Sequence, residues 1–423
     1  MSEPAVHAAT YAQELLGLVE SMLPGTVMNP RFTVRAAYRL PAGTDVAVLR
    51  AALDDVVARH GALRTRLVRD GDGLRQEVLA PMPARLDVTR LPAGEPVREW
   101  IAAAAVRPRP PHEPPLLWAE LCLPDDGGDP VLVLVGHHIA VDGWSQDVLA
   151  RDLADAYAAR LDGRVLGDPP LQYTDIAAQD RGGAWQERIR QVLPYWRERL
   201  TGIAGLGLPC ETPGAEPGPP AVHRFTLAPD LALAVRQSAR RARSTPFALL
   251  MTAFVRGVLP PGDTLVPVIT AGRIPSEWDT VGFLLNVLPI RVDDTGQDLD
   301  ALRGHIDGRC REAYAHDIPW VPVLGAAPEM PARLTDRARV PPVFQMIPRP
   351  PLAPPREPGA RPLVALPDQS LPPQVIPVPF AWTVRWDTTP QVYVTYDSHL
   401  FGPRWMRAAE AGFLTALTRL AGR

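Results

Sequence analysis

Two adjacent histidines, His137 and His138, are the residues of this chain whose type and position most directly suggest chemistry. They end the stretch VLVLVGHH, residues 131–138, and Asp142 and Gly143 follow shortly after. A histidine titrates near neutrality, so it can accept or donate a proton at physiological pH. Asp142 could orient an imidazole or pair with an arginine, and Gly143 lets other groups approach closely. The pattern allows three interpretations: a catalytic base with its supports, a metal site, or the polar end of a buried strand.

The two imidazoles are expected to diverge. Successive side chains of an extended segment point to opposite faces, so one histidine can face a cavity while the other packs inward. Ligands of one metal ion must converge, and none of the histidines shows H-x-x-x-H spacing. We therefore expect no metal at this motif. The residue types alone leave open both a catalytic base and a hydrogen-bonded core histidine beside a tight turn.

The elements around the motif indicate mixed α/β structure. Residues 131–135 form a continuous apolar run, which is typical of a strand buried on both faces. Ser145 can cap the helix that follows. Earlier in the chain, a Thr-Asp cap at 44–45 precedes apolar residues at helical spacing, Gly61 ends that helix, and residues 63–67 alternate like a strand.

The second half repeats this alternation of helices and strands. Residues 244–247, Ser-Thr-Pro-Phe, are typical of a helix start, and the Pro/Gly-rich residues 208–224 resemble a connection between halves. A proline-dense stretch at about 348–379 cannot be a central strand or a helix, so we expect an ordered surface loop or lid. The length suits two α/β subdomains, which we place at residues 1–200 and 201–423.

Composition excludes several classes of function. A net charge of −3, without long runs of one sign, predicts no strongly basic surface that would bind nucleic acid or an anionic membrane. All 44 basic residues are arginine, which excludes lysine chemistry such as a Schiff base. Cys122, Cys210 and Cys310 are too scattered for a zinc cluster or a disulfide framework. The N-terminus lacks the charge order of a secretory signal and no apolar run could cross a bilayer, so we expect a cytoplasmic protein, acting as a monomer.

Residues 137–143 have the pattern H-H-x-x-x-D-G, followed by Trp-Ser. This pattern resembles the core motif of the condensation domains of nonribosomal peptide synthetases, in the chloramphenicol-acetyltransferase-like superfamily. Further stretches resemble other motifs of that family and keep the family's order: ARHGALRT at 58–65, LQYTDIAAQ at 171–179, VGFLLNVLPIRV at 281–292, HDIPW at 316–320 and RVPPVFQM at 339–346. The first family motif is reduced to TYAQELLGL, and the block PFAWTVRW lacks the K-F-D-L of many members.

The resemblance implies an α/β fold of two acetyltransferase-like subdomains arranged as a V, with the active site in a tunnel at their junction. It implies that His138 acts as hydrogen-bond acceptor or general base toward an acceptor amine, and that His137 is structural. It also implies a salt bridge between Asp142 and Arg291. The other expected site residues support the motif or line the tunnel: Gly143, Arg64, Trp144 and Asn286.

The activity implied by the resemblance is attack of an amine or hydroxyl on a carrier-bound acyl thioester, which forms an amide or an ester. Donor and acceptor carrier proteins are the expected partners, with no tightly bound cofactor and with phosphopantetheine arms carrying the substrates. An acyl-CoA-dependent O- or N-acyltransferase would keep the same histidine and stays an alternative. A non-catalytic recruitment domain is a further alternative, although such members tend to lose the second histidine or the glycine.

Two other subtypes are disfavoured by the motifs. An epimerase relative would need an E-G-H-G motif, which the sequence lacks, and a cyclising relative would carry an aspartate in place of His137. Adenylation, carrier and thioesterase motifs are also missing from the sequence. We expect a free-standing condensation enzyme or one domain of a larger synthetase, and the initial methionine favours the former.

Overall fold

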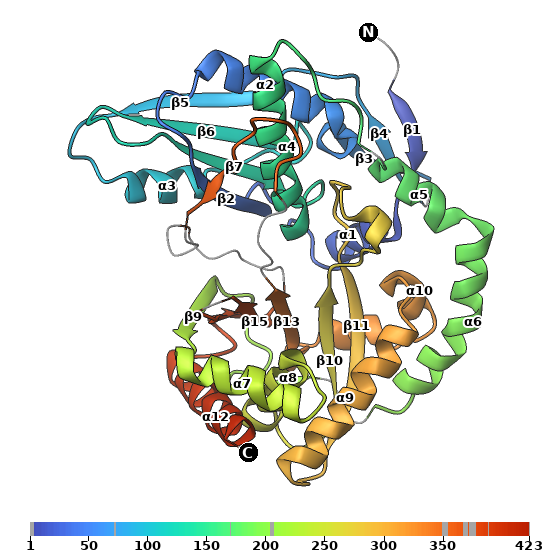
Figure 1. Cartoon of the computed structure of the whole chain (residues 1–423). Coiled ribbons are helices and arrows are strands. Elements are labelled where there is room, and N and C mark those ends of the chain that lie inside the picture. Colours follow the sequence, from blue (N-terminus) through green and yellow to red (C-terminus); the bar gives the residue numbers. More distant parts are fainter. Residues whose placement is uncertain are drawn as a thin grey trace. The chain divides into compact units, whose positions relative to one another are not determined.

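The computed structural model describes residues 4–71, 73–169, 171–203, 207–348, 354–366, 371, 378–387 and 389–422. The chain forms two compact α/β units, each with its own sheets and helices (Figure 1). Unit 1 comprises Met1–Gln186, Ala271–Leu285 and Pro351–Gln374. Unit 2 comprises Glu187–Thr270, Asn286–Pro350 and Val375–Arg423.

Unit 1 contains the sheet that carries the histidine motif. Its strand order is β14-β2-β7-β6-β5, with β5 and β6 parallel and the other neighbours antiparallel. The strands are β2 (Thr33–Arg39), β5 (Arg85–Leu91), β6 (Leu117–Pro124), β7 (Val131–His137) and β14 (Val364–Ala365). A smaller sheet has the order β1-β4-β3 and consists of β1 (Ala5–Ala8), β3 (Thr65–Asp70) and β4 (Gly73–Val78).

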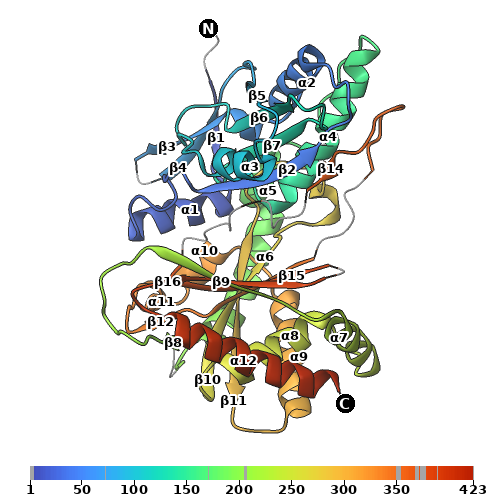
Figure 2. The ribbon, with the colours of Figure 1, turned by 90° about the vertical axis from the view of Figure 1, so that its left-hand side faces the viewer.

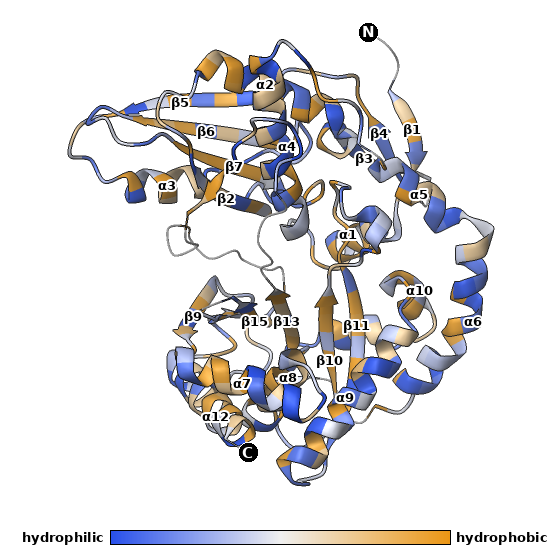
Figure 3. Cartoon of the chain, in the orientation of Figure 1, coloured by the Kyte–Doolittle hydropathy of each residue, from blue (hydrophilic) through white to orange (hydrophobic). Residues whose placement is uncertain are grey.

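The helices of unit 1 cover these sheets and meet in one core. They are α1 (Tyr11–Met22), α2 (Val46–Arg59), α3 (Val97–Val106), α4 (Gly143–Leu161) and α5 (Tyr173–Arg181). Helix α2 packs on α4, and α3 packs on β6 and β7. All seven residues of β7 are buried, which confirms the prediction of a strand covered on both faces. Figure 3 shows the hydrophobic colouring of β6 and β7 at the centre of this unit.

Unit 2 is built on a six-stranded sheet of order β11-β10-β13-β15-β16-β9. Its strands are β9 (Pro220–Thr226), β10 (Gly262–Thr270), β11 (Asn286–Asp294), β13 (Val343–Pro348), β15 (Phe380–Trp386) and β16 (Gln391–Asp397). A short pair, β8 (Leu208–Pro209) and β12 (Arg339–Val340), lies outside this sheet. Strand β13 is parallel to both of its neighbours, and the other pairs are antiparallel.

Four helices of unit 2 pack together: α7 (Pro229–Arg241), α8 (Pro246–Val258), α9 (Leu299–Ala315) and α12 (Pro403–Ala421). Figure 2 shows α7, α8 and α12 on one side of strands β9, β15 and β16. Helices α8 and α12 cross closely at Gly257 and Gly412. A Cβ on Gly257 would lie 2.4 Å from the carbonyl carbon of Gly412, so neither position accepts a side chain at this separation. The short helices α10 (Trp320–Gly325) and α11 (Met330–Leu334) complete the unit.

The division into units differs from the predicted boundary at residue 200. The chain passes from unit 1 to unit 2 inside a single helix, α6 (Gly183–Leu200), and residues 208–224 belong to unit 2 rather than to a linker. Two segments of the second half, Ala271–Leu285 and Pro351–Gln374, return to unit 1. Local periodicity could not reveal this exchange, because it depends on contacts between residues more than a hundred positions apart.

The proline-dense stretch predicted at 348–379 is described in part. Residues 354–366 belong to unit 1, where β14 pairs with the edge of β2 and the Leu366 amide donates to the Ala37 carbonyl, 2.8 Å away. Residues 349–353, 367–370 and 372–377 lie outside the described residues.

Three local predictions are tested by the helix ends. Thr245 caps α8 and Pro246 occupies its first turn, as predicted. Ser145 is not the cap of α4: Asp142 is, because its carboxylate accepts from the Ser145 amide at 2.8 Å. Gly61 starts a 3₁₀ turn, Gly61–Arg64, and the strand begins only at Thr65.

Candidate active site

Strand β7 and helix α4 hold the histidine motif in a tight connection. The strand ends at His137 and the helix begins at Gly143. The His138 amide donates to the Phe32 carbonyl at 2.9 Å, and the Val141 amide donates back to the His137 carbonyl at 3.1 Å. Val141 therefore folds against the strand. A Cβ on Gly136 would lie 2.7 Å from the side chain of Val141, so only glycine fits before the two histidines.

The two histidines have different partners, as their alternation along the strand predicts. His137 is fully buried, and its Nε2 hydrogen-bonds the Asn29 carbonyl at 3.1 Å. Burial lowers the pKa of His137 to about 4, so this imidazole is neutral at physiological pH. His137 is thus fully buried and bound to the main chain, and its structural role stays a prediction.

His138 is held as a neutral imidazole with one nitrogen engaged. Its Nδ1 lies 2.8 Å from the Val141 carbonyl, which can only accept, so Nδ1 carries the proton. Burial lowers the pKa of His138, although the hydrogen bond to Val141 opposes this shift. No described residue hydrogen-bonds Nε2. Nε2 is therefore the unprotonated nitrogen and can accept a proton or a hydrogen bond.

Two aromatic rings flank the His138 imidazole. The Phe32 ring lies 4.8 Å away at an interplanar angle of 36°, and the Phe283 ring meets it edge-on at 5.1 Å. Phe32 precedes β2, whereas Phe283 belongs to the segment Ala271–Leu285 that returns to unit 1. These apolar neighbours limit rotation of the imidazole and favour its neutral form.

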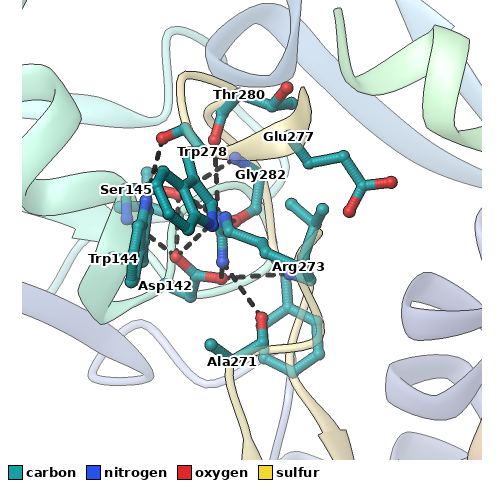
Figure 4. Close-up of polar contacts among 12 residues, drawn as sticks. Asp142, Trp144, Ser145, Ala271, Arg273, Glu277, Trp278, Thr280 and Gly282 are labelled. Carbon is teal, nitrogen blue, oxygen red and sulfur yellow. Dashed lines mark hydrogen bonds and ion pairs between the residues drawn. The ribbon is translucent and has the colours of Figure 1, made fainter. Parts of the chain in front are cut away.

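Asp142 forms a buried ion pair with Arg273 (Figure 4). The two guanidinium nitrogens lie 2.5 Å and 3.0 Å from the two carboxylate oxygens. Asp142 also accepts from the Ser145 amide and hydroxyl and from the Leu284 amide. Burial alone would raise the pKa of Asp142, but Arg273 and these hydrogen bonds hold it below its usual value. Asp142 is therefore a permanent anion that fixes the loop, not a proton carrier.

The predicted salt bridge between Asp142 and Arg291 is wrong. Arg291 lies in the middle of β11 in unit 2, where its guanidinium binds Asp263 on the neighbouring strand at 2.6 Å and 2.8 Å. Arg273, on the loop that returns to unit 1, takes the position predicted for Arg291. Little in the sequence points to this choice, because Arg273 is one of 44 arginines and lies outside the motif block that contains Arg291.

Arg64 and Asn286 each stabilise backbone within one unit. Arg64 donates to the Val57 and Ala58 carbonyls at 3.0 Å and 3.1 Å, and also to Leu79, so it satisfies the C-terminal end of α2. Asn286 donates to the Asp317 carboxylate and the Ile318 carbonyl and accepts from the Trp320 amide. Its amide group is thus engaged in holding the HDIPW segment, and its place in a substrate tunnel stays a prediction.

Trp144 and Gly143 lie at the start of α4. The Trp144 indole donates to the Trp278 carbonyl at 2.8 Å, and the two indole rings lie 6.0 Å apart (Figure 4). Trp144 therefore anchors the returning loop, and its place beside a substrate stays a prediction. A Cβ on Gly143 would meet nothing within 4 Å, so the fold leaves space for a side chain at the first position of α4.

The part of the chain that the structure describes contains no group of three or more histidine, cysteine, aspartate or glutamate residues able to hold a metal ion. None of its helices is both long and apolar enough to span a membrane.

Comparison with known proteins decides the family. Residues 18–317 match the family described as "Condensation domain". The chain belongs to the condensation-domain family. It is 34% identical over 340 residues to CymA of Salinispora arenicola, described as a probable non-canonical nonribosomal peptide synthetase, and 30% identical over 348 residues to the phosphinothricin tripeptide synthetase PhsC of Streptomyces viridochromogenes. The aligned regions cover 75% and 78% of this chain but only 4% of CymA and 31% of PhsC.

Solved structures of similar fold match almost the whole chain. The SgcC5 protein of Streptomyces globisporus, crystallised with (R)-(-)-1-(2-naphthyl)-1,2-ethanediol and sucrose, has a TM-score of 0.86 and 31% identity and covers 98% of this chain and 99% of its own. The X-domain from teicoplanin biosynthesis has a TM-score of 0.81 at 22% identity and covers 100% of this chain and 96% of its own, which shows a shared fold. The predicted chloramphenicol-acetyltransferase-like α/β fold is therefore confirmed.

Two site features of this condensation domain were not predicted from its sequence. The first is Arg273 as partner of the motif aspartate, and the second is the pair of phenylalanines around His138. Phe283 stands inside the recognised block at 281–292, so its position was available as a signal, whereas Phe32 lies in no recognised motif.

Proposed function

We propose that this condensation domain joins an acceptor amine to an acyl group that a carrier protein presents as a phosphopantetheine thioester. The observation that carries the proposal is the state of His138: it is neutral, its Nδ1 proton is bound to the Val141 carbonyl, and its Nε2 is open. A buried, neutral imidazole with an unprotonated nitrogen has the properties required of a general base or hydrogen-bond acceptor.

The reaction follows from these groups. The amine nitrogen attacks the thioester carbonyl carbon, a C–N bond forms, and the C–S bond breaks to release the phosphopantetheine thiol. Nε2 of His138 accepts a hydrogen bond or a proton from the attacking amine, and the proton ends on the leaving sulfur. Because the thioester is already activated, no acyl-enzyme is required, and alignment of the two substrates supplies much of the rate increase.

The start of α4 is suited to the developing oxyanion. The Gly143 amide lies at the positive end of a 19-residue helix, where backbone N–H groups favour a negative charge. Asp142 and Arg273 neutralise each other and hold this helix start against the segment that carries Phe283. They position the site without exchanging protons.

A hydroxyl acceptor is the second candidate. The observation that favours it is the aromatic 1,2-diol bound in the SgcC5 structure, since that protein aligns with nearly the entire chain. Attack by a hydroxyl would use the same open Nε2 and would form an ester. An acyl-CoA donor and a non-catalytic recruitment role also stay open, and the intact histidine, aspartate and glycine of the motif support catalysis.

The proposal is tested by offering matched donors and acceptors to the purified protein. The same acyl group is presented on a carrier protein and on coenzyme A, each with an amine and with an aromatic 1,2-diol, and products are measured by mass spectrometry. We expect amide or ester from the carrier-bound donor at a rate well above that from acyl-CoA. Faster transfer from acyl-CoA would contradict the carrier-dependent assignment, and no transfer from any donor would favour recruitment.

A further inference from the structure

We propose that Tyr173 is a positioning residue for catalysis, which acts on His138 through the main chain and ring of Phe283. This inference rests on the proposed function of His138. Tyr173 is the first residue of α5 and only 2% exposed, so it cannot touch a substrate from solvent. Its hydroxyl lies 2.5 Å from the Phe283 carbonyl, and the Phe283 ring is one of the two rings that flank the His138 imidazole.

The directions of the hydrogen bonds around Tyr173 follow from its partners. A carbonyl can only accept, so the Tyr173 hydroxyl donates its single hydrogen to Phe283. The contact of 3.0 Å between Tyr173 and Thr10 must then be donated by the Thr10 hydroxyl. The Thr10 hydroxyl oxygen in turn accepts from the main-chain amide of Gln13 at 3.0 Å. The first turn of α1 thereby fixes the orientation of the Tyr173 hydroxyl.

Tyr173 also defines the path of the backbone next to Phe283. Its ring lies so close to Gly282 that a Cβ there would stand 2.5 Å from the tyrosine Cδ2. The Gly282 amide donates to the Ser145 hydroxyl at 3.1 Å, and the Leu284 amide donates to Asp142 at 3.1 Å. The backbone on both sides of Phe283 is therefore tied to the motif loop, and Tyr173 supplies the bond to the Phe283 carbonyl itself.

The consequence for His138 is control of ring orientation. The bond from Nδ1 to the Val141 carbonyl restrains one edge of the imidazole, and a single hydrogen bond leaves the ring free to tilt. The rings of Phe283 and Phe32, which both contact the imidazole, restrict that freedom. Loss of the Tyr173 bond would leave the buried Phe283 carbonyl without its hydrogen-bond donor and let the Phe283 backbone shift. The imidazole of His138 could then tilt, and its Nε2 would no longer point in a fixed direction.

Tyr173 does not act as an acid or base itself. Its hydroxyl hydrogen is donated to a carbonyl. Burial is the main reason why the pKa of the Tyr173 phenol lies far above the physiological range. The role assigned to it is therefore geometric. This role differs from simple stabilisation because it predicts an effect on the His138 imidazole that a comparable loss elsewhere would not produce.

The test compares Tyr173→Phe with Ser238→Ala. Ser238 in unit 2 is also buried and also donates its hydroxyl hydrogen to a carbonyl, that of Leu420, at 2.9 Å. Steady-state kinetics use the carrier-bound donor, and long-range ¹H–¹⁵N NMR of histidine-labelled protein reports the tautomer of His138, whose signals are assigned by their loss in His138→Gln. We expect Tyr173→Phe to lower kcat about 10- to 100-fold with KM nearly unchanged and to move the His138 nitrogen signals. Ser238→Ala should do neither.

A second variant keeps the proposal testable if Tyr173→Phe does not fold. Phe283→Leu preserves the carbonyl and its bond to Tyr173 but removes the ring, and it should lower kcat as Tyr173→Phe does, with KM nearly unchanged. Unchanged His138 signals and wild-type kcat in Tyr173→Phe would overturn the inference. If His138→Gln itself retains activity, the proposed function fails, whereas the NMR comparison still decides whether Tyr173 positions His138.

Discussion

Asp142 and Arg273 form a two-point ion pair in which the carboxylate side chain is fully buried and the guanidinium side chain is 1% exposed. The partners lie 131 positions apart in the chain. Arg273 belongs to Ala271–Leu285, which leaves the strands of unit 2 to pack in unit 1. This pair fixes the returning segment next to the histidine motif, so the motif is completed by a part of the chain that sequence order places elsewhere.

Breaking this pair should destabilise the protein strongly. Arg273→Gln leaves a buried carboxylate without its counterion, and we expect a loss of about 3–5 kcal/mol in the free energy of unfolding. The matched variant is Arg291→Gln, which breaks the partly exposed pair with Asp263 and the bonds to the Arg199 and Thr201 carbonyls, and it should cost clearly less than Arg273→Gln. Urea titration followed by circular dichroism measures both. Equal losses in the two variants would show that Arg273 does not have the special role assigned here.

Asp155 should hold residues 354–366 on unit 1. Its Oδ1 accepts from the amides of Arg356 and Glu357 at 2.8 Å and 2.9 Å, and Asp279 pairs with the Arg356 guanidinium at 2.8 Å. In Asp155→Ala both amides lose their acceptor, so we expect hydrogen exchange in peptides covering 354–366 to become at least several-fold faster. Peptides from α12 in unit 2 serve as the internal reference. Exchange that stays the same in Asp155→Ala would mean that the ion pairs alone hold the segment.

Activity should be retained at mildly acidic pH. Burial lowers the pKa of His138, and a general base is active only when deprotonated, so activity is present above this pKa and is lost as the pH falls through it. We expect the acid limb of kcat/KM to lie below pH 6.5, the ordinary value. A weakly basic amine acceptor should be used, so that its own protonation does not produce the limb. An acid limb at or above pH 6.5 that does not change with the pKa of the acceptor amine would contradict the assigned state of His138.

Asp180 provides a separate test of the pH dependence of stability. Burial raises the pKa of its carboxyl to about 6, although a hydrogen bond from the Tyr11 amide opposes the shift. The unfolded state has the ordinary value of 3.8, so the folded state binds a proton first as the pH falls, and ionised Asp180 destabilises the fold above pH 6. Asp180→Asn keeps an acceptor for Tyr11 and should stabilise the protein at pH 8 by about 1–3 kcal/mol.

This gain should shrink as the pH falls from 6 to 4, because the wild-type carboxyl then becomes protonated in the folded state. Thermal melting at several pH values measures this gain in stability. A stability difference between wild type and Asp180→Asn that does not change with pH would contradict the raised pKa.

The sequence predicted those features that depend on local pattern. The apolar run before His137 indicated a fully buried strand, and alternation along that strand indicated that the two histidines diverge. The helix start at residues 244–247 was readable for the same reason, since it depends only on neighbouring residues. These predictions required no knowledge of distant contacts.

Features that depend on distant packing were not predictable in this way. Arg273 and Arg291 have the same side chain, and only the path of the chain after β10 decides which of them meets Asp142. The passage between units falls at Gln186 and Glu187 inside α6, and the proline of this helix, Pro194, lies several positions beyond that boundary and does not mark it. Asp142 itself shows that one residue can fill two roles, helix cap and ion-pair partner, where the sequence suggested Ser145 for the first.

The central claim is that His138 supplies the unprotonated nitrogen for condensation, and single-turnover transfer in His138→Gln tests it most directly. Glutamine retains a polar side chain but offers no basic nitrogen at the Nε2 position. The matched control is His223→Gln, which changes a partly buried histidine of unit 2 that binds Glu410. We predict that His138→Gln folds like the wild type and loses at least about 100-fold in the transfer rate from the loaded carrier, while His223→Gln stays within about twofold. Transfer at the wild-type rate in a folded His138→Gln protein would contradict the account.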